Sequence, residues 1–424
     1  MIDNGWLSPR YALGANFPIL KPITDVTTMR GPTGHILEEV RRELNSIGLS
    51  TDRIREGGLN IVTTINAKYQ AAAERAVLLK TPKDAPEDLH VGLVAIKPGT
   101  GEVVALFGGK DYLKRQLNDA TQGIAQAGST FKVFTLAAAL ERGIPLSSIW
   151  DGKSPQIFTG MGETYRVSNY GNANFGRISL LTATANSVNT VFVRLNYRVG
   201  PSNAVDAARR AGIPNSVEML STPSFVLGVS SPRVVDVATA FATFASQGLY
   251  TKTHLVSKVE ERSSKKTIYL SKEIPKRVFK ANVMADLTYA LRAVVRVGTA
   301  SAAVGGLGRP VAGKTGTSQE NASAWFSGFT PQLSASVALF RDDATESLKQ
   351  IGGLNAVTGG SFPARIWAAF VSEALRGEPT LPFPNPAFIG GSRPIDLINP
   401  SPTPKPSSTE PDFTSIKKIG RAHV

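Results

Sequence analysis

The chain has 424 residues, of which 42% are hydrophobic and 19% are charged, and its formal net charge is +14. This length and composition fit a globular protein of two or three domains and exclude a disordered chain. The chain contains no cysteine, so disulfides and thiolate metal sites are excluded, and its four histidines show no metal-ligand spacing. The basic residues occur as scattered pairs without stacking aromatic residues, which argues against nucleic-acid binding.

The first part of the chain, residues 1–57, is polar and mixed in composition. Within it, the spacing of Ile36, Val40 and Leu44 predicts an amphipathic helix over residues 35–47. We interpret residues 1–57 as a linker before the main domain. The chain has no run of about 18 apolar residues that would span a membrane, and its start lacks the pattern of a signal peptide.

Residues 58–378 have the pattern of a single α+β domain. β-Branched runs bounded by turn residues predict strands near both ends, and strands joined by tight turns must be antiparallel. We therefore expect an antiparallel β-sheet flanked by helices and interrupted by an all-helical subdomain. The predicted elements are, in chain order, a strand at 59–65, a helix at 67–79, a hairpin at 91–107, a mainly helical region at 129–300, a hairpin at 324–339 and a helix at 362–375.

The last part of the chain, residues 379–424, is rich in proline, serine and threonine and predicts a flexible tail. Its final six residues, 419–424, resemble a translated sequencing adapter. We expect these six residues to be artefactual and the natural C-terminus to be different.

The first candidate for chemistry is an SxxK pattern at Ser129 and Lys132. The same pattern occurs at Ser263 and Ser415, but only Ser129 follows a glycine and opens an apolar run that predicts a helix. Residues three apart share a helix face, so Lys132 is expected one turn from Ser129. Free N–H groups at a helix N-terminus favour negative charge, which suits a nucleophile whose product carries an oxyanion. Taken alone, the pattern fits an ordinary N-cap serine equally well.

Two further motifs follow, the only SxN, at Ser187 and Asn189, and the only KTG, which begins at Lys314. Positions i and i+2 of a continuous helix point in nearly opposite directions, so we expect a break between two helices at the SxN motif. Lys314 precedes the second predicted hairpin, which favours a strand position. Each motif alone also fits a polar interruption or a turn. Together, in the order SxxK, SxN, KTG, they are the known signature of β-lactamases and penicillin-binding proteins.

Around these motifs the sequence resembles the transpeptidase domain of class A penicillin-binding proteins, most closely that of actinobacterial bifunctional enzymes. The resemblance covers about residues 58–378. Beyond the three motifs it is carried by residues 305–318 (GGLGRPVAGKTGTS), 324–332 (AWFSGFTPQ) and 357–361 (VTGGS).

The chain departs from the family's pattern at two positions and lacks two of its parts. Ala127 stands where a proline is usual, and Ser323 stands where an acidic residue is common. The catalytic motif of the glycosyltransferase domain and the membrane anchor that such enzymes carry are both absent from this sequence. We therefore expect an N-terminally truncated fragment of a longer enzyme.

The resemblance implies a penicillin-binding/serine β-lactamase-like fold and a serine-type D-Ala-D-Ala transpeptidase with no cofactor and no metal. Ser129 would form an acyl-enzyme with a peptidoglycan stem peptide, and Lys132 would take its proton. A free lysine has a pKa of about 10.4, so Lys132 needs a pKa lowered by about three units through burial and the neighbouring charge of Lys314. Ser187 would relay a proton to the leaving group, and Asn189 would position the substrate amide.

Substrate binding is assigned by the same resemblance to the KTG strand. The hydroxyls of Thr315 and Thr317, with Lys314, would hold the terminal carboxylate. The backbone N–H groups of Ser129 and Thr317 would form the oxyanion hole. The residues expected to bind substrate are Thr315, Gly316, Thr317 and Ser318.

The implied partners are a D-Ala-D-Ala donor peptide, an amine acceptor peptide and β-lactams, and no nucleic acid. The implied location is the extracytoplasmic face of the bacterial membrane, held there by an anchor that is missing from this sequence. A D,D-carboxypeptidase or a β-lactamase would use the same residues but let water resolve the acyl-enzyme. A penicillin-binding sensor remains a further alternative from a different class.

Overall fold

The computed structural model describes residues 2–5, 7–14, 29–160 and 163–398. Its centre is a five-stranded sheet in the order β12-β13-β14-β2-β3, in which every neighbouring pair is antiparallel. The two ends of the domain meet where β14 pairs with β2, from Ser334 opposite Ile96 to Arg341 opposite Leu89. The two predicted hairpins and the antiparallel sheet are thereby confirmed. The strands are β2 Leu89–Ile96, β3 Val103–Phe107, β12 Ala312–Thr317, β13 Ser323–Phe329 and β14 Ser334–Arg341.

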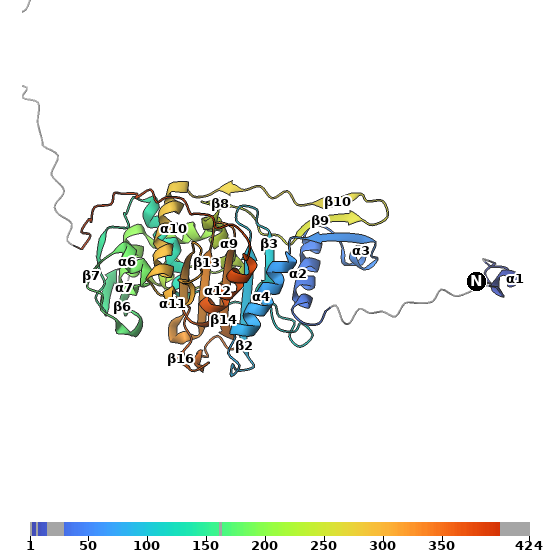
Figure 1. The fold of residues 1–424 in the computed structure, drawn as a ribbon, viewed down its shortest axis with the longest axis horizontal. Helices are drawn as coiled ribbons and strands as arrows, with labels where there is room; N and C mark the ends of the chain where they lie inside the picture. The colour runs from blue at the N-terminus through green and yellow to red at the C-terminus, as the bar shows by residue number, and fades with distance from the viewer. Residues whose placement is uncertain (1, 6, 15–28, 161–162, 399–424) are drawn as a thin grey trace, which may run out of the picture.

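Helices cover both faces of this sheet. In Figure 1, α4 and α12 lie side by side across the sheet, and Trp367 of α12 donates from Nε1 to the carbonyl oxygen of Ala335 at 3.0 Å. On the opposite face α9 packs against β2, β13 and β14. Because both faces of the sheet are covered, β2, β13 and β14 are buried at nearly every position rather than at alternate ones. The helices are α4 Ala67–Lys80, α9 Val234–Ala245 and α12 Phe362–Ala374, with the short α11 Ser301–Val304 nearby.

The region between the two hairpins is built around α5 (Lys132–Glu141), which is buried along nearly its whole length. It packs against α7, α8 and α10, but short strands line the edge of this region, which is therefore not helical throughout. In the β5–β6 hairpin Ile157 is 63% exposed and Phe158 only 7%, so only one face of the hairpin is buried. The strands are too short for this alternation of buried and exposed residues to be recognised in the sequence. The elements are β4 Ile149–Asp151, β5 Gln156–Gly160, β6 Glu163–Val167, β7 Arg177–Ser179, α6 Leu180–Ala185, α7 Asn189–Val199, α8 Pro201–Ala211, β8 Leu249–Tyr250, β11 Lys276–Arg277 and α10 Ala281–Arg296.

The segment predicted as a separate linker is partly built into the domain. Helix α2 packs against β3 and β9, and the Glu43 carboxylate accepts the backbone N–H groups of Leu255 and Val256 at 2.7 and 2.9 Å. Thr121 donates its hydroxyl to Glu39 of the same helix at 2.9 Å. Figure 1 shows α2 beside β3 and the small β1-β9-β10 sheet at this end of the molecule. The elements are α1 Pro9–Ala12, α2 Thr33–Ser46, α3 Thr51–Arg55, β1 Leu59–Thr63, β9 Val256–Glu261 and β10 Thr267–Leu270.

Residues 379–398 pack against the domain, in contrast to the flexible tail that their composition predicted. The carboxylate of Asp286, on α10, accepts the backbone N–H groups of Ala387, Phe388 and Ile389 at 2.6 to 2.9 Å. Further along, the backbone pairs with Ile149 of β4. A buried carboxylate therefore supplies the acceptors that a proline-rich segment cannot find in regular secondary structure. The remainder of the predicted tail, with its suspected artefact at 419–424, lies outside the described residues.

We predict that Asp286→Ala destabilises the protein by about 2–4 kcal/mol, because three backbone N–H groups lose a charged and buried acceptor. Urea unfolding measures this free energy. Asp206→Ala, which removes an exposed carboxylate that pairs with Arg210, is the matched control and is expected to cost under about 1 kcal/mol. Equal losses in the two variants would contradict the role of Asp286.

Candidate active site

Ser129 lies in η1 (Gly128–Phe131), a single 3-10 turn that leads directly into α5. Because residues three apart eclipse each other in such a turn, Lys132 Nζ donates to Ser129 Oγ at 2.9 Å. Ser129 is half-buried and Lys132 is fully buried. Ser263, which fits the same pattern, lies in an exposed turn between β9 and β10. The predicted meeting of a hydroxyl and an amine at the start of this helix is confirmed.

Ser187 and Asn189 lie at a break between α6 and α7, as the SxN motif predicted. Ser187 has a φ of 56°, in the left-handed region, and this turns the chain so that both side chains reach Lys132. Lys132 Nζ donates to Ser187 O at 2.6 Å, to Ser187 Oγ at 3.1 Å and to Asn189 Oδ1 at 2.5 Å. A non-glycine residue held in this conformation is a form of strain that recurs at functional sites.

Lys314 enters the same network from the sheet. It lies on β12, an edge strand, and its Nζ donates to Ser187 Oγ at 2.8 Å and to Thr315 O at 2.9 Å. The three motifs therefore converge, although they lie on three elements that are far apart in the chain. The outer edge of β12 carries no partner strand among the described residues, so a peptide backbone can pair with it.

No negative charge offsets the two amines among the described residues. The oxygens that contact Lys132 and Lys314 belong to hydroxyl, amide and carbonyl groups. Burial lowers the pKa of Lys314 from 10.5 to about 7. Burial, and secondly the charge of Lys314, lower the pKa of Lys132 well below its usual 10.5. A neutral Lys132 amine beside a hydroxyl is able to accept its proton.

The hydroxyls of Thr315 and Thr317 lie on the face of β12 opposite Lys314, since side chains alternate along a strand. Thr315 Oγ1 is 2.7 Å from Thr299 Oγ1, and Thr317 Oγ1 accepts the N–H of Gly359 at 3.1 Å. Thr299 follows α10 and was missed from the sequence, because it belongs to no motif and meets Thr315 only in the folded chain. Its one local signal is the glycine before it, where a side chain would collide with Ala185 O.

Ser318 stabilises the turn after β12, and its hydroxyl is therefore not available to bind a substrate. Its Oγ accepts the N–H of Ser323 at 2.8 Å, and its own N–H binds Ser323 O at 3.1 Å. Ser323, one of the two departures from the family's pattern, donates its hydroxyl to Gln126 O at 2.6 Å. Trp325 Nε1 donates to the same carbonyl at 2.8 Å. These contacts fix the segment that leads to Ser129 against β13.

Two glycines allow η1 to lie directly on β12. Gly128 has a φ of 54°, and a Cβ there would lie 2.5 Å from the carbonyl carbon and oxygen of Thr317. A Cβ at Gly316 would lie 2.5 Å from Ala127 O. Gly316 therefore contributes close packing beneath Ser129, which is what a glycine at this point of the KTG motif allows.

Comparison with known proteins agrees with this geometry. Residues 91–347 match the family model of the penicillin binding protein transpeptidase domain. The chain belongs to this family. It is 33% identical to penicillin-binding protein 1A of Mycolicibacterium smegmatis, over 99% of this chain and 55% of the relative. It is 32% identical to penicillin-binding protein 1A of Mycobacterium tuberculosis, over 92% of this chain and 49% of the relative.

Solved structures of the family share the fold. The structure of PonA1 from Mycobacterium tuberculosis in complex with penicillin V has a TM-score of 0.76 at 30% identity, covering 85% of this chain and 98% of that one. Penicillin-binding protein 1A from Haemophilus influenzae, at 18% identity, has a TM-score of 0.77 and covers 93% and 81%. The expected penicillin-binding fold is thereby confirmed.

The chain spans about half the length of the curated relatives that it matches, 55% of one and 49% of another. Among the described residues, no helix combines the length and apolarity needed to cross a membrane. Within the same residues, no group of three or more potential metal-ligating side chains is assembled.

We predict that Gly128→Ala lowers the rate of covalent labelling by a fluorescent penicillin at least about tenfold, because its Cβ forces η1 away from β12. Gly143→Ala is the control for backbone strain alone: Gly143 also has a positive φ, 76°, but nothing lies within 4 Å of its Cβ. Both variants should lose about 1 kcal/mol of stability from the left-handed alanine. Equal labelling rates in the two variants would show that contact between η1 and β12 is unimportant.

Proposed function

We propose that this chain is a serine-type D-Ala-D-Ala transpeptidase that cross-links peptidoglycan stem peptides through an acyl-enzyme at Ser129. The observation that carries the proposal is the 2.9 Å hydrogen bond between Ser129 Oγ and a fully buried Lys132 whose partners are all uncharged. Such a lysine gives up its proton readily and can activate a serine hydroxyl without a histidine.

In the proposed acylation, Ser129 Oγ attacks the carbonyl carbon between the two terminal D-alanines. Lys132 Nζ takes the hydroxyl proton, and the backbone N–H groups of Ser129 and Thr317 hold the developing oxyanion. When the C–N bond breaks, Ser187 passes a proton to the leaving D-alanine amine. Ser187 Oγ suits this relay because it contacts both Lys132 Nζ and Lys314 Nζ.

Asn189 has partners at both ends of its amide, Lys132 at Oδ1 and Ser168 O at Nδ2. These contacts support a role in orienting the lysine amine. The substrate contact implied by the family resemblance needs one of these bonds to be exchanged, and it stays a prediction.

The terminal carboxylate of the donor peptide is proposed to bind at the threonine hydroxyls of β12. Within the Thr299–Thr315 pair only one O–H is used, so one hydroxyl hydrogen remains to donate. Thr317 accepts from Gly359 and keeps its own hydrogen. These hydroxyl donors form a site for a carboxylate group along the unpaired edge of β12, with Thr299 added to the residues expected from the sequence. Lys314, on the other face of the strand, is proposed to attract the carboxylate by its positive charge.

The amine of a neighbouring stem peptide then attacks the ester carbonyl, and Ser129 is released with its proton. Penicillins are proposed to acylate Ser129 in the same way and to remain attached. The peptide substrates, the extracytoplasmic location and the anchored, bifunctional full-length enzyme rest on the relatives named penicillin-binding protein 1A and belong to this proposal. The division into residues 1–57, 58–378 and 379–424 also remains a proposal, although α2 and residues 379–398 contact the central domain.

We predict that Ser129→Ala abolishes covalent labelling by a fluorescent penicillin, a loss of more than about a thousandfold in rate, because no other oxygen replaces the nucleophile. Ser263→Ala, in the exposed second SxxK pattern, is the matched control and should label at the wild-type rate. Retained labelling of Ser129→Ala would refute the assignment. Labelling that decays within seconds would favour a β-lactamase-like hydrolase over a transpeptidase.

The buried amines predict a pH dependence. Lys132 accepts a proton only when it is neutral, so the acylation rate falls as the pH drops through the pKa of Lys132. Lys314→Gln removes the charge that helps to lower this pKa, so the pKa of Lys132 rises and the falling limb of the pH–rate profile moves to higher pH.

The measurement is the second-order rate constant of penicillin acylation between pH 5 and 10. Lys314→Arg keeps a positive charge and should leave the limb near its wild-type position. If the falling limb of the pH–rate profile stays in place in Lys314→Gln, or moves to lower pH, Lys132 is excluded as the proton acceptor.

A further inference from the structure

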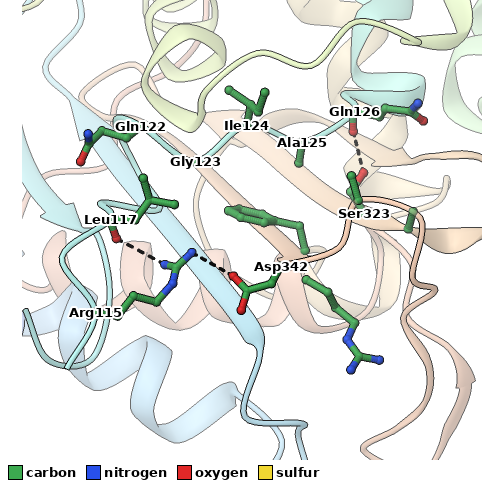
Figure 2. Close-up of a pocket in the computed structure, with 13 residues that line it drawn as sticks. Arg115, Leu117, Gln122, Gly123, Ile124, Ala125, Gln126, Ser323 and Asp342 are labelled. Atoms are coloured by element: carbon green, nitrogen blue, oxygen red, sulfur yellow. Dashed lines mark hydrogen bonds and ion pairs between the residues drawn. The ribbon is translucent and has the colours of Figure 1, made fainter.

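A hollow of about 220 Å3 lies on the same face of the sheet as Ser129, beside the ends of β13 and β14. Gly316 pairs with Trp325, and the Trp325 indole binds Gln126 O, so the segment that leads to Ser129 crosses this face. Figure 2 shows the segment from Gln122 to Gln126 along one wall of the hollow, with Arg115 and Asp342 on the opposite wall.

In the wall formed by residues 122–126, the stretch from Ile124 onward pairs with residues 230–233 along one edge and leaves its other edge unpaired within the described residues. The N–H groups of Ala125 and Ala127 bind the carbonyl oxygens of Pro232 and Ser230. Because N–H groups alternate in direction along an extended chain, those of Ile124 and Gln126 point to the other side, toward the hollow. In the described part of the chain neither of these two N–H groups has a backbone partner. Such an edge is suited to pairing with the backbone of a bound peptide.

The opposite wall carries a positive and a negative charge that both have bonding capacity left. Arg115 Nη2 lies 3.3 Å from Asp342 Oδ1, which also contacts His90 Nε2 at 2.8 Å. The Asp342 side chain is 62% exposed, and its Oδ2 forms no hydrogen bond among the described residues. Arg115 also binds Asp119 and Leu117 O, and its Nε remains without a partner in the same residues. A ligand with an ammonium group beside a carboxylate would match this pair, since the ammonium would bind Asp342 and the carboxylate would bind Arg115.

Two apolar side chains border the hollow and remain unusually exposed. Ile124 is 61% exposed and Leu117 is 44% exposed. Both line the hollow, together with the buried ring of Phe340. A cavity with apolar borders, a few polar groups that converge and an open backbone edge has the general character of a ligand-binding site.

We propose that this hollow is a second peptide subsite, which binds a zwitterionic amino-acid residue of a stem peptide through Asp342, Arg115 and the N–H groups of Ile124 and Gln126. The proposal rests on the function proposed above, since it assigns part of the same substrate. The segment that forms the wall leads to the nucleophile three residues later, so the hollow adjoins the stretch of chain that carries Ser129. The bound residue belongs either to the donor peptide or to the amine acceptor.

The test compares Asp342→Asn with Asp343→Asn, which changes the same charge on a neighbouring residue that does not line the hollow. In the donor arm, a peptide that ends in D-Ala-D-Ala and carries a free amine and carboxylate on a preceding side chain competes with fluorescent penicillin. In the acceptor arm, a D-alanyl thioester acylates the enzyme, and the ratio of transfer over hydrolysis is measured for an acceptor peptide that carries its attacking amine on one residue and a free amine and carboxylate on another. Ile124→Ser, at an exposed position, is the second variant in both arms.

We expect Asp342→Asn to lower one of these readouts about fivefold or more, through loss of a charged contact at a partly exposed site, and Ile124→Ser to lower the same readout. A fall in the donor arm assigns the hollow to the donor peptide, and a fall in the acceptor arm assigns it to the amine. Penicillin acylation should stay within about twofold of wild type in all variants, because penicillin lacks the bound residue.

No change in either arm would overturn the second subsite, and so would an equal fall in Asp343→Asn. Loss of penicillin acylation in Asp342→Asn would also overturn it, since the variant would then act on the reacting centre. The proposed function fails separately, if the wild-type protein does not label at Ser129.

Discussion

The active site depends on the burial of two lysine amines in a place where the described residues supply no negative charge. Lowering the pKa of Lys314 from 10.5 to about 7 corresponds to about 4–5 kcal/mol against its charged form. Burial also disfavours the charged form of Lys132, and the neighbouring amine of Lys314 adds to this effect. A carboxylate beside either amine would remove this penalty, but it would also keep Lys132 protonated and unable to act as a base. The uncharged oxygens of Ser187 and Asn189 satisfy the N–H donors without restoring the charge.

Such a penalty is sustained only if the surrounding structure prevents water from reaching the amines. Lys132 opens α5, whose residues as far as Leu140 are buried, and Lys314 lies in β12, between η1 and the rest of the sheet. The two amines come from the two halves of the domain, so neither half alone would hold the arrangement. Residues 379–398 also join these halves, because Pro379 O accepts from Gln332, in the turn between β13 and β14, while Asp286 on α10 and Ile149 on β4 bind the later residues. Lys132 is therefore neutral only when the whole domain is packed around it.

The sequence predicted the parts of the site that depend on local geometry. The SxxK spacing places Ser129 and Lys132 together in any helical turn, and the SxN spacing requires the break that occurs at Ser187. The sequence did not reveal Thr299 or the internal hydrogen bonds of Ser318, since both depend on which strand lies beside which. It also misjudged residues 379–398, because their composition is that of a linker, while contacts with residues distant in the chain, among them the Asp286 carboxylate and the backbone of Ile149, hold them against the domain. The β5–β6 and β4–β7 pairs were missed because strands this short leave too little periodicity to read.

The fold explains what serine contributes at position 323, where the family often has an acidic residue. Its hydroxyl donates to Gln126 O, a carbonyl that also receives the indole N–H of Trp325. A carboxylate at position 323 has no proton to donate at neutral pH and would repel this carbonyl oxygen, so the segment before Ser129 would have to lie elsewhere. With serine, the carbonyl of Gln126 is fully used toward β13, while the N–H groups of Ile124 and Gln126 remain open toward the hollow. One short segment therefore holds the nucleophile at its end and presents an unpaired edge along its length, and the residue at position 323 sets where that edge lies.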